Sequence, residues 1–407
     1  MIEAKQKTSA IRFVLVTVFA YSMSFGIIMP VLPNLIMELE GVSLSQATFL
    51  GGLVAASYAM FQFLLGPFVG NLGDRFGRRP VFLFSLAGFS IDFVLMGFAQ
   101  NIIWLFVGRS IAGGLGAIFG PANATMSDLS SGEDRAKSFG MVGAAFGIGF
   151  VVGPALGGVL GEFGTRTPFF VAGAIAGIAF VYGYFFFPET MPASSRRAFS
   201  LKRSNPIGAF FSLKKLNGVT SIALIYLIWL TSTNVYAVSW SYFAQLKFDW
   251  SVRTVGISLT LVGISMAVFQ ATIIGRVVKR FGERHTAMIG LSFATFGMWF
   301  YAFNNNATLA LWFCLAVGMQ GMVMPSLNAM MSRRTPENSQ GELQGFNGSM
   351  AALGALISPL IYNTSLSYFT SDASQIHFPG APFLISGSIA LMALIGLSRL
   401  KPAAQTS

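Results

Sequence analysis

Two ionisable residues interrupt long apolar stretches of this sequence. Asp92 lies in the apolar run 80–100 and Arg109 in the run 102–126. If both runs are membrane helices, each residue stands roughly 10–12 Å from the end that the helices share, since a helix rises about 1.5 Å per residue. Charges inside a membrane are costly and mark functional sites. We therefore interpret Asp92 as the carrier of a coupling proton and Arg109 as the group that tunes it, with a static ion pair between two helices as the alternative.

Single polar and aromatic side chains occur in other apolar runs. Amides, aromatic rings and methionines around one cavity suit an uncharged or amphipathic ligand. The alternative is that these side chains only join neighbouring helices by hydrogen bonds. The candidates for substrate binding are Tyr21, Tyr58, Gln62, Asn234, Tyr236, Trp240, Gln270, Gln320, Asn328 and Asn347.

Several other chemistries lack the residues that they need. The two histidines, His285 and His377, fall at the edges of apolar runs, and Cys314 is the only cysteine. The sequence has no cluster of His, Cys and acidic residues for a metal, and no glycine-rich loop with Lys and Ser or Thr for a nucleotide. We therefore expect that the protein holds no metal or cofactor and is not an enzyme. A proton gradient would supply the energy for its activity.

The elements that position these residues are long apolar runs. The chain of 407 residues is 54% hydrophobic and 10% charged, whereas a soluble domain is roughly 25% charged. A helix needs about 20 mainly apolar residues to cross a bilayer. We predict an all-α membrane protein whose twelve transmembrane helices cover 11–36, 48–70, 80–100, 102–126, 138–162, 167–187, 217–243, 253–277, 285–303, 307–331, 342–365 and 380–400.

The basic residues predict the orientation of these helices. The net charge is +11, but the Lys and Arg residues sit in short gaps between apolar runs, so they indicate topology rather than a nucleic-acid partner. With the N-terminus in the cytoplasm, 22 of the 26 Lys and Arg fall on the cytoplasmic side, and only Arg166, Lys247 and Arg253 fall outside. We expect a multi-pass protein of the inner (plasma) membrane, with both termini cytoplasmic, as a monomer in the lipid bilayer.

One stretch of the sequence recurs. The segments 70–79 and 275–284 share a first Gly, an Arg-Phe-Gly triplet and a last Arg at an offset of 205 residues, and the same offset places Asn123 on Asn328. Such repeats indicate duplication. We predict two six-helix halves, 1–187 and 217–407, joined by a basic cytoplasmic linker at 188–216. Halves of this kind face each other across a cavity and rock to alternate its access.

The loop at 70–80 combines glycines, an aspartate and arginines. Gly73 and Gly77 allow a turn of two or three residues, and Asp74 can pair with a nearby Arg or a helix N-terminus. Arg78 and Arg79 can reach Asp128 at the end of the fourth predicted helix. We predict a latch that holds the cytoplasmic side shut, and the alternative is that the arginines only set topology. The predicted gating residues are Gly70, Asp74, Arg75, Gly77, Arg78, Arg79 and Asp128.

The fifth predicted helix is rich in glycine. Gly149, Gly153 and Gly157 recur every four residues and lie on one helical face, where they allow another helix to approach closely. Pro154 frees a backbone carbonyl and can bend the helix, and Gly158 follows one turn later. Ordinary helix packing is the alternative interpretation.

These motifs resemble those of a known family. The loop at 70–80 resembles the signature loop of the major facilitator superfamily, and Gly153-Pro154 followed by Gly157-Gly158 resembles the antiporter motif of its drug exporters. Almost the whole chain resembles the tetracycline efflux proteins, through the stretches 26–33, 73–80, 132–135 and 341–345 and through Tyr58 and Gln62. The resemblance implies the major facilitator fold and export of a drug in exchange for protons. It also places Asp92 and Arg109 on ionisable positions of such transporters.

The chain departs from that family at three positions. The family has an acidic residue where this chain has Tyr21, a histidine where it has Met266, and an acidic residue where it has Ala294. The resemblance links these positions to drug or proton handling, so the identity of the exported compound stays open. We predict a proton-coupled secondary transporter that exports a small amphipathic drug or metabolite by alternating access. The alternatives are a facilitator or proton symporter for a metabolite, and a non-transporting membrane sensor of the same fold.

Overall fold

The computed structural model describes residues 4–116, 118–130, 135–192, 194, 196–199, 219–335 and 340–400. This part of the chain is helical and contains no strand. Its elements are α1 (Ala4–Ile28), α2 (Leu32–Glu40), α3 (Leu44–Phe76), α4 (Arg78–Gly97), α5 (Ile102–Leu115), α6 (Phe119–Leu129), α7 (Arg135–Leu160), η2 (Gly161–Phe163), α8 (Thr167–Phe186), α10 (Thr220–Thr233), α11 (Val235–Phe248), α12 (Val252–Thr272), α13 (Ile274–Phe303), α14 (Ala307–Phe313), η4 (Val317–Met322), α15 (Val323–Ser332), α16 (Gln340–Thr370) and α17 (Ala381–Arg399).

The structure confirms the predicted transmembrane segments. Twelve segments of the described chain are long and apolar enough to cross a membrane, and each overlaps one predicted run. Two helices extend well beyond their predicted runs. α13 begins at Ile274 instead of near residue 285, across a kink at Gly282, and α3 continues to Phe76 although its apolar run ends near Gly70. The polar turn of this helix therefore projects beyond the apolar layer.

Four spans are interrupted, and each is the first of three consecutive spans. The predicted run 11–36 is not one helix, because α1 ends at Ile28 and α2 begins at Leu32. Pro30 lies in the gap and Pro33 in the first turn of α2, and a proline lacks the N–H that a helix interior needs. The other interruptions follow α5, α10 and α14. The regular spacing of the breaks supports a repeated three-helix unit.

The two halves repeat the same turn at the predicted offset. Gly77 (φ 103°) and Gly282 (φ 74°) both have positive φ values, which glycine adopts without steric cost. Two residues after each glycine, an arginine reaches the last turn of another helix. Arg79 donates to the Tyr184 carbonyl at 2.6 Å, and Arg284 donates to the Ser398 carbonyl at 2.8 Å. The sequence repeat is therefore also a repeat in structure.

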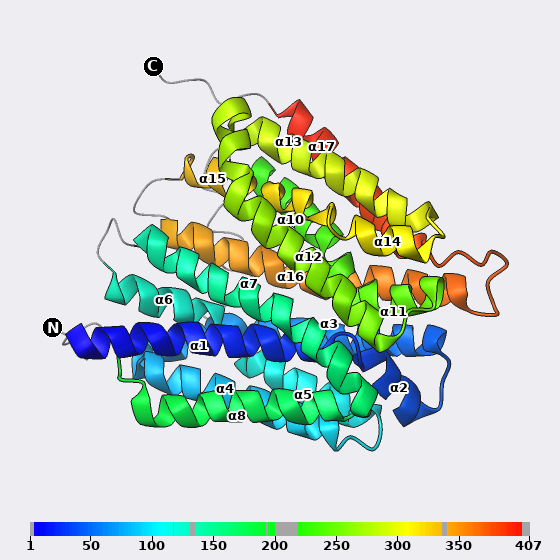
Figure 1. Cartoon of the computed structure of the whole chain (residues 1–407). Coiled ribbons are helices and arrows are strands. Elements are labelled where there is room, and N and C mark those ends of the chain that lie inside the picture. The colour runs from blue at the N-terminus through cyan, green and yellow to red at the C-terminus, as the bar shows by residue number, and fades with distance from the viewer. Residues whose placement is uncertain are drawn as a thin grey trace.

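The halves contact each other mainly through two helix pairs, α7 with α12 and α3 with α16. A Cβ atom on Gly158 would lie 3.1 Å from the Arg253 Cα, and Ser45 donates to the Ser367 carbonyl at 2.8 Å. Asn363 of α16 donates across the junction to the Thr48 carbonyl at 3.1 Å. All these residues lie toward the end of the bundle opposite the start of α1 and the end of α17. In Figure 1 the first half (blue to green) lies beside the second (yellow-green to red).

The same helices lack close neighbours at the end that holds the chain termini. Among the described residues, and apart from the helix's own neighbouring backbone, no atom lies within 4 Å of a Cβ built on six glycines of this region. They are Gly66 and Gly70 of α3, Gly140, Gly143 and Gly147 of α7, and Gly348 of α16. The halves are thus packed together at one end of the bundle and separated at the other.

The three basic residues that the predicted orientation places outside, Arg166, Lys247 and Arg253, have specific partners. Arg166 donates to the Ala99 carbonyl at 2.7 Å and Lys247 to the Ala302 carbonyl at 2.6 Å. Each therefore satisfies a carbonyl at the C-terminal end of a helix, where cations are favourable. Arg253 forms an ion pair with Glu162 of the other half at 3.5 Å. These residues stabilise the packed end of the bundle.

Candidate functional site

Asp92 and Arg109 form a buried ion pair between α4 and α5. Arg109 Nε donates to Asp92 Oδ1 at 3.2 Å and Nη2 contacts Oδ2. Asp92 is 0% exposed and Arg109 is 4% exposed. A Cβ atom on Gly108 would lie 2.6 Å from Asp92 Oδ1, so the glycine makes room for the carboxylate. The predicted equal depth of the two residues is confirmed, and the two-point contact is the strong form of such a pair.

A chain of aromatic and polar groups connects this pair to α3 and α1. The Arg109 guanidinium lies 5.7 Å from the centre of the Tyr58 ring, a distance typical of cation–π contacts. The Tyr58 and Tyr21 hydroxyls are 3.1 Å apart, and Gln62 donates to the Tyr58 hydroxyl at 3.4 Å. Tyr21, Tyr58 and Gln62 are half-buried. Three predicted substrate residues therefore lie together, next to the ion pair.

The predicted substrate residues of the second half fall into separate groups. Asn347 of α16 donates to Asn328 of α15 at 3.0 Å, and Gln320 and Tyr236 line one hollow between α11, α13 and the α14–η4 segment. Asn234 stands at the break between α10 and α11, and Gln270 is exposed on α12. No single cluster gathers all of them in this conformation.

Trp240 is placed differently from the prediction. It is 0% exposed and donates to the Ser258 hydroxyl at 2.8 Å. Its ring centre lies 4.9 Å from Tyr301 and 5.7 Å from Phe383. Trp240 therefore belongs to the aromatic core of the second half and lines no cavity in this structure, because its polar atom is satisfied and its ring is enclosed.

The loop at 70–80 is tighter than predicted. Gly77 alone joins α3 to α4, while Gly73 is helical, since one positive-φ residue is enough for the turn. Asp74 pairs with Arg78 at 3.0 Å, as expected for an aspartate beside an arginine. Arg75 lies over the Phe76 ring at 5.0 Å. The side chain of Asp128 lies outside the described residues.

Glu189 is a partner of this loop that sequence reasoning missed. Its two carboxylate oxygens accept from the Arg78 and Arg79 backbone N–H groups at 2.9 and 3.2 Å. The carboxylate thus caps the N-terminus of α4, where an anion is favourable. The sequence gives little sign of this contact, because Glu189 stands 111 positions after Arg78. It lies in a segment without a recognisable motif, just after the end of α8. Glu189 connects the end of α8 to the turn.

The glycines of α7 allow α1 to approach closely. A Cβ on Gly153 would lie 2.9 Å from the Gly26 Cα, and one on Gly149 or Gly157 would meet the backbone of α1. Gly158 points the other way, toward Arg253 and Gly256 of α12. The expected close approach is confirmed, and α7 packs against both α1 and the other half.

The sequence and fold match a known family of membrane proteins. A model of the Major Facilitator Superfamily matches residues 14–245 and 222–406. The chain belongs to the Major Facilitator Superfamily. This facilitator is 33% identical to the class C tetracycline resistance protein of Escherichia coli, over 97% of this chain and 98% of the relative. It is 30% identical to multidrug resistance protein 2 of Bacillus subtilis (strain 168), over 96% and 94%.

Solved structures agree with the facilitator fold. The crystal structure of the human organic anion transporter MFSD10 aligns with a TM-score of 0.74 at 20% identity, over 96% of this chain and 99% of that one. The D-xylose-proton symporter aligns with a TM-score of 0.76 at 16% identity, over 97% and 98%. At these identities the likeness concerns the fold alone.

The structure also locates the positions at which this facilitator departs from the tetracycline efflux pattern. Tyr21, in place of an acidic residue, contacts Tyr58, and thus lies beside the group that faces Arg109. Ala294 is 2% exposed in the core of the second half, and Met266 packs against the same core. Only the first departure lies near the ion pair.

Proposed function

We propose that this facilitator exports a small amphipathic compound in exchange for protons. The observation that carries the proposal is the buried Asp92–Arg109 pair beside the half-buried Tyr58, Tyr21 and Gln62. A membrane-buried carboxylate with one cationic partner can be neutralised by a proton. The neighbouring tyrosines and amide offer hydrogen bonds to a ligand.

Protonation of Asp92 would change the balance around Arg109. The neutral carboxyl no longer compensates the guanidinium, and an uncompensated buried charge is strongly unfavourable. The Tyr58 ring already faces the guanidinium and can take over part of this role. A change at Asp92 is therefore transmitted to Tyr58 and to its partner Tyr21. In this way Asp92 carries the proton and Arg109 tunes it.

The proposed export direction rests on the predicted orientation of the chain. The positive-inside rule favours cytoplasmic termini and a single chain is enough to enclose the site, so we take the protein as a monomer with both termini inside. The separated end of the bundle then faces the cytoplasm, and the packed end faces outward. A ligand enters from the cytoplasm and leaves after the halves 1–187 and 217–407 rock about the linker.

The substrate class follows from the site and from the relatives. The named relatives include tetracycline, multidrug and quinolone resistance proteins, so export of an amphipathic drug is the activity to test first. Apart from Arg109, the polar side chains near Asp92 (Tyr58, Tyr21 and Gln62) are uncharged, which suits a ligand with a large apolar surface. Tyr21 replaces the acid of the tetracycline pattern, so tetracycline is one probe among several.

The turn at Gly77 supports the proposed cytoplasmic latch. Asp74, Arg78 and Glu189 form one connected group there, and Arg79 ties it to the end of α8. Closing the cytoplasmic end would bring this group toward the opposite half. The latch then forms in the outward-facing state and opens in the state seen here.

Proteoliposomes with an imposed pH gradient test the function. Wild-type protein should move tetracycline or ethidium against their concentration gradient when protons flow the other way. Asp92→Asn should abolish proton-driven flux, and Asp372→Asn, a matched change on the exposed surface, should leave it intact. Undiminished proton-driven flux in Asp92→Asn would disprove the role of Asp92 as the proton carrier. Flux only in the direction of proton flow would replace export by symport.

A further inference from the structure

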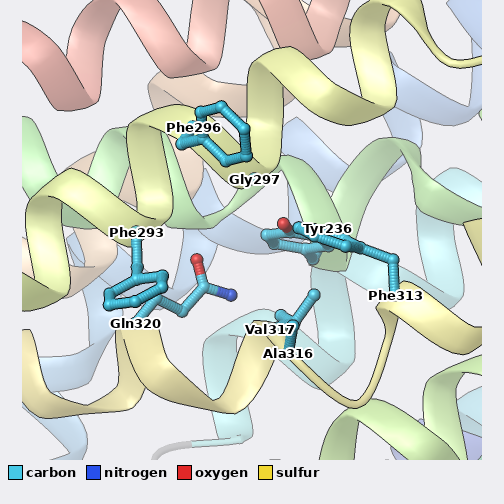
Figure 2. Close-up of a pocket in the computed structure, with 8 residues that line it drawn as sticks. All are labelled: Tyr236, Phe293, Phe296, Gly297, Phe313, Ala316, Val317 and Gln320. Carbon is cyan, nitrogen blue, oxygen red and sulfur yellow. The ribbon is translucent and has the colours of Figure 1, made fainter.

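A small hollow lies in the second half, away from the Asp92–Arg109 pair. It has a volume of about 100 Å³ and lies between α13, α11 and the α14–η4 segment. Figure 2 shows the rings of Phe293 and Phe296 on one side and Phe313 and Tyr236 on the other, with Gln320 between them. Phe293 is 45% exposed and Phe296 is 67% exposed. The hollow is therefore apolar and its rim lies on the surface of the bundle.

One polar atom in this hollow has no partner. Gln320 is 3% exposed, and it lines the hollow together with Tyr236. Its Oε1 atom is buried and has no hydrogen-bond partner among the residues that the structure describes. Figure 2 shows the two ends of the amide pointing in different directions within the hollow. A buried acceptor without a donor is unfavourable. A ligand that donates a hydrogen bond to Gln320 Oε1 would remove this cost.

The internal repeat explains why space is present here. The offset of 205 residues pairs Asp92 with Gly297 and Gly108 with Phe313. In the first half Gly108 makes room for Asp92, and in the second half a Cβ on Gly297 would lie 3.3 Å from Phe313. The same two positions are therefore in contact in both halves. The glycine is at the second position in the first half (Gly108) and at the first position in the second half (Gly297). The place that the ion pair fills in one half is lined by Gly297 in the other.

We propose that this hollow binds a ring-sized apolar group that carries one hydrogen-bond donor, supplied by a molecule dissolved in the bilayer. The donor bonds to Gln320 Oε1, and the ring packs against Phe293, Phe296 and Phe313. The size is suitable, because an apolar protein cavity of about 150 Å³ binds benzene and this hollow is open at its rim. An aromatic amine or phenol has the required chemistry.

This site is separate from the proposed export pathway. It contains neither Asp92 nor Arg109, and binding requires no proton gradient. It adds a membrane-facing ligand site to the transport site proposed beside Asp92. The two proposals are tested independently. A failed binding test at this hollow does not contradict drug export, and a failed export test does not contradict binding at this hollow.

A pair of probes distinguishes the donor from the ring. Wild-type protein in lipid nanodiscs is titrated with para-fluoroaniline, which has a donor, and with para-fluoroanisole, which has none. Saturable binding is followed by fluorine NMR, with empty nanodiscs to subtract partitioning. We expect the aniline to bind about tenfold more tightly, because only it satisfies the buried acceptor.

Variants then assign the binding to this hollow. Gly297→Leu fills the space and should remove saturable binding of both probes, and Gly297→Ala, which adds one methyl, should weaken it. Gln320→Leu should keep ring binding and bring the aniline-to-anisole ratio to about one, since no acceptor remains. Phe303→Leu, an exposed position farther along α13, is the matched control and should bind as the wild type. Equal binding of both probes to the wild type, or undiminished aniline binding in both Gly297 variants, would overturn the proposal.

Discussion

Glu283 forms an ion pair with Arg333 at 2.8 Å, and it joins the start of the ninth span to the end of the tenth. At the offset of 205 residues, the first half has Arg78 and Asp128. The two halves therefore carry the same pair of positions with exchanged charges. This relationship extends the predicted latch, which considered the first half only, to a second element in the other half.

Exchanging the charges of this pair tests whether the latch exists in the second half. Arg333→Glu places two like charges together and should reduce transport, because repulsion would separate the span ends that this ion pair holds together in the present state. Adding Glu283→Arg should restore most of the rate. The side chain of Arg333 is 77% exposed, so the effect on thermal stability should be below about 1 kcal/mol. A double variant no faster than Arg333→Glu would contradict the prediction in the proteoliposome assay.

The buried ion pair predicts a strong asymmetry between single and double variants. Arg109→Met leaves the Asp92 carboxylate buried without its partner and should cost about 3–5 kcal/mol of stability. The double variant Asp92→Asn with Arg109→Met should recover a large part, because both charges are gone. Thermal unfolding of the purified proteins measures both effects. Equal losses of stability in the single and double variants would show that the unpaired Asp92 carboxylate does not cause the destabilisation of Arg109→Met.

The glycines of α7 provide a matched pair of substitutions. Gly157→Ala should destabilise the protein by about 1–3 kcal/mol, because its Cβ would meet the Ile27 carbonyl of α1. Gly147→Ala, in the same helix, has no atom within 4 Å of the new Cβ. It should be neutral or stabilising, since alanine favours the helix. Thermal unfolding in one detergent compares them, and a similar loss in both would refute the packing argument.

The packed end of the bundle predicts a reversible lock. The hydroxyl oxygens of Ser45 in α3 and Thr370 in α16 are 2.9 Å apart across the halves, so cysteines at these two positions should form a disulfide. With Cys314→Ala as background, oxidation of Ser45→Cys with Thr370→Cys should stop transport, and reduction should restore it. Each single cysteine variant is the control. Continued transport by the oxidised, cross-linked protein would show that this end does not have to open.

The sequence predicted the membrane segments because each requires only a local property. A run of about 20 apolar residues can satisfy its backbone in a bilayer only as a helix. The repeat was visible for a similar reason, since Gly77 and Gly282 meet the same demand for positive φ. Depth along a helix follows from a constant rise, and this predicted similar depths for Asp92 and Arg109 without a structure.

The local signals failed where a contact decided the outcome. Trp240 was predicted to line a cavity, yet neighbouring rings and Ser258 enclose it. Glu189 was overlooked, because only the fold brings its carboxylate to the first turn of α4. The break between α1 and α2 had a local signal in Pro30, but the span around it is apolar throughout.

The sequence by itself determined that this chain is a duplicated twelve-span facilitator with one charged pair in its first half. Tertiary structure decided which end of the bundle is packed, which glycines are contacts and which face open space. It also decided that Gly297 borders a hollow while Asp92, at the matching position, fills its site. The physical reason is that helix formation depends on neighbours in sequence, whereas cavities, caps and ion pairs depend on atoms brought together from distant segments.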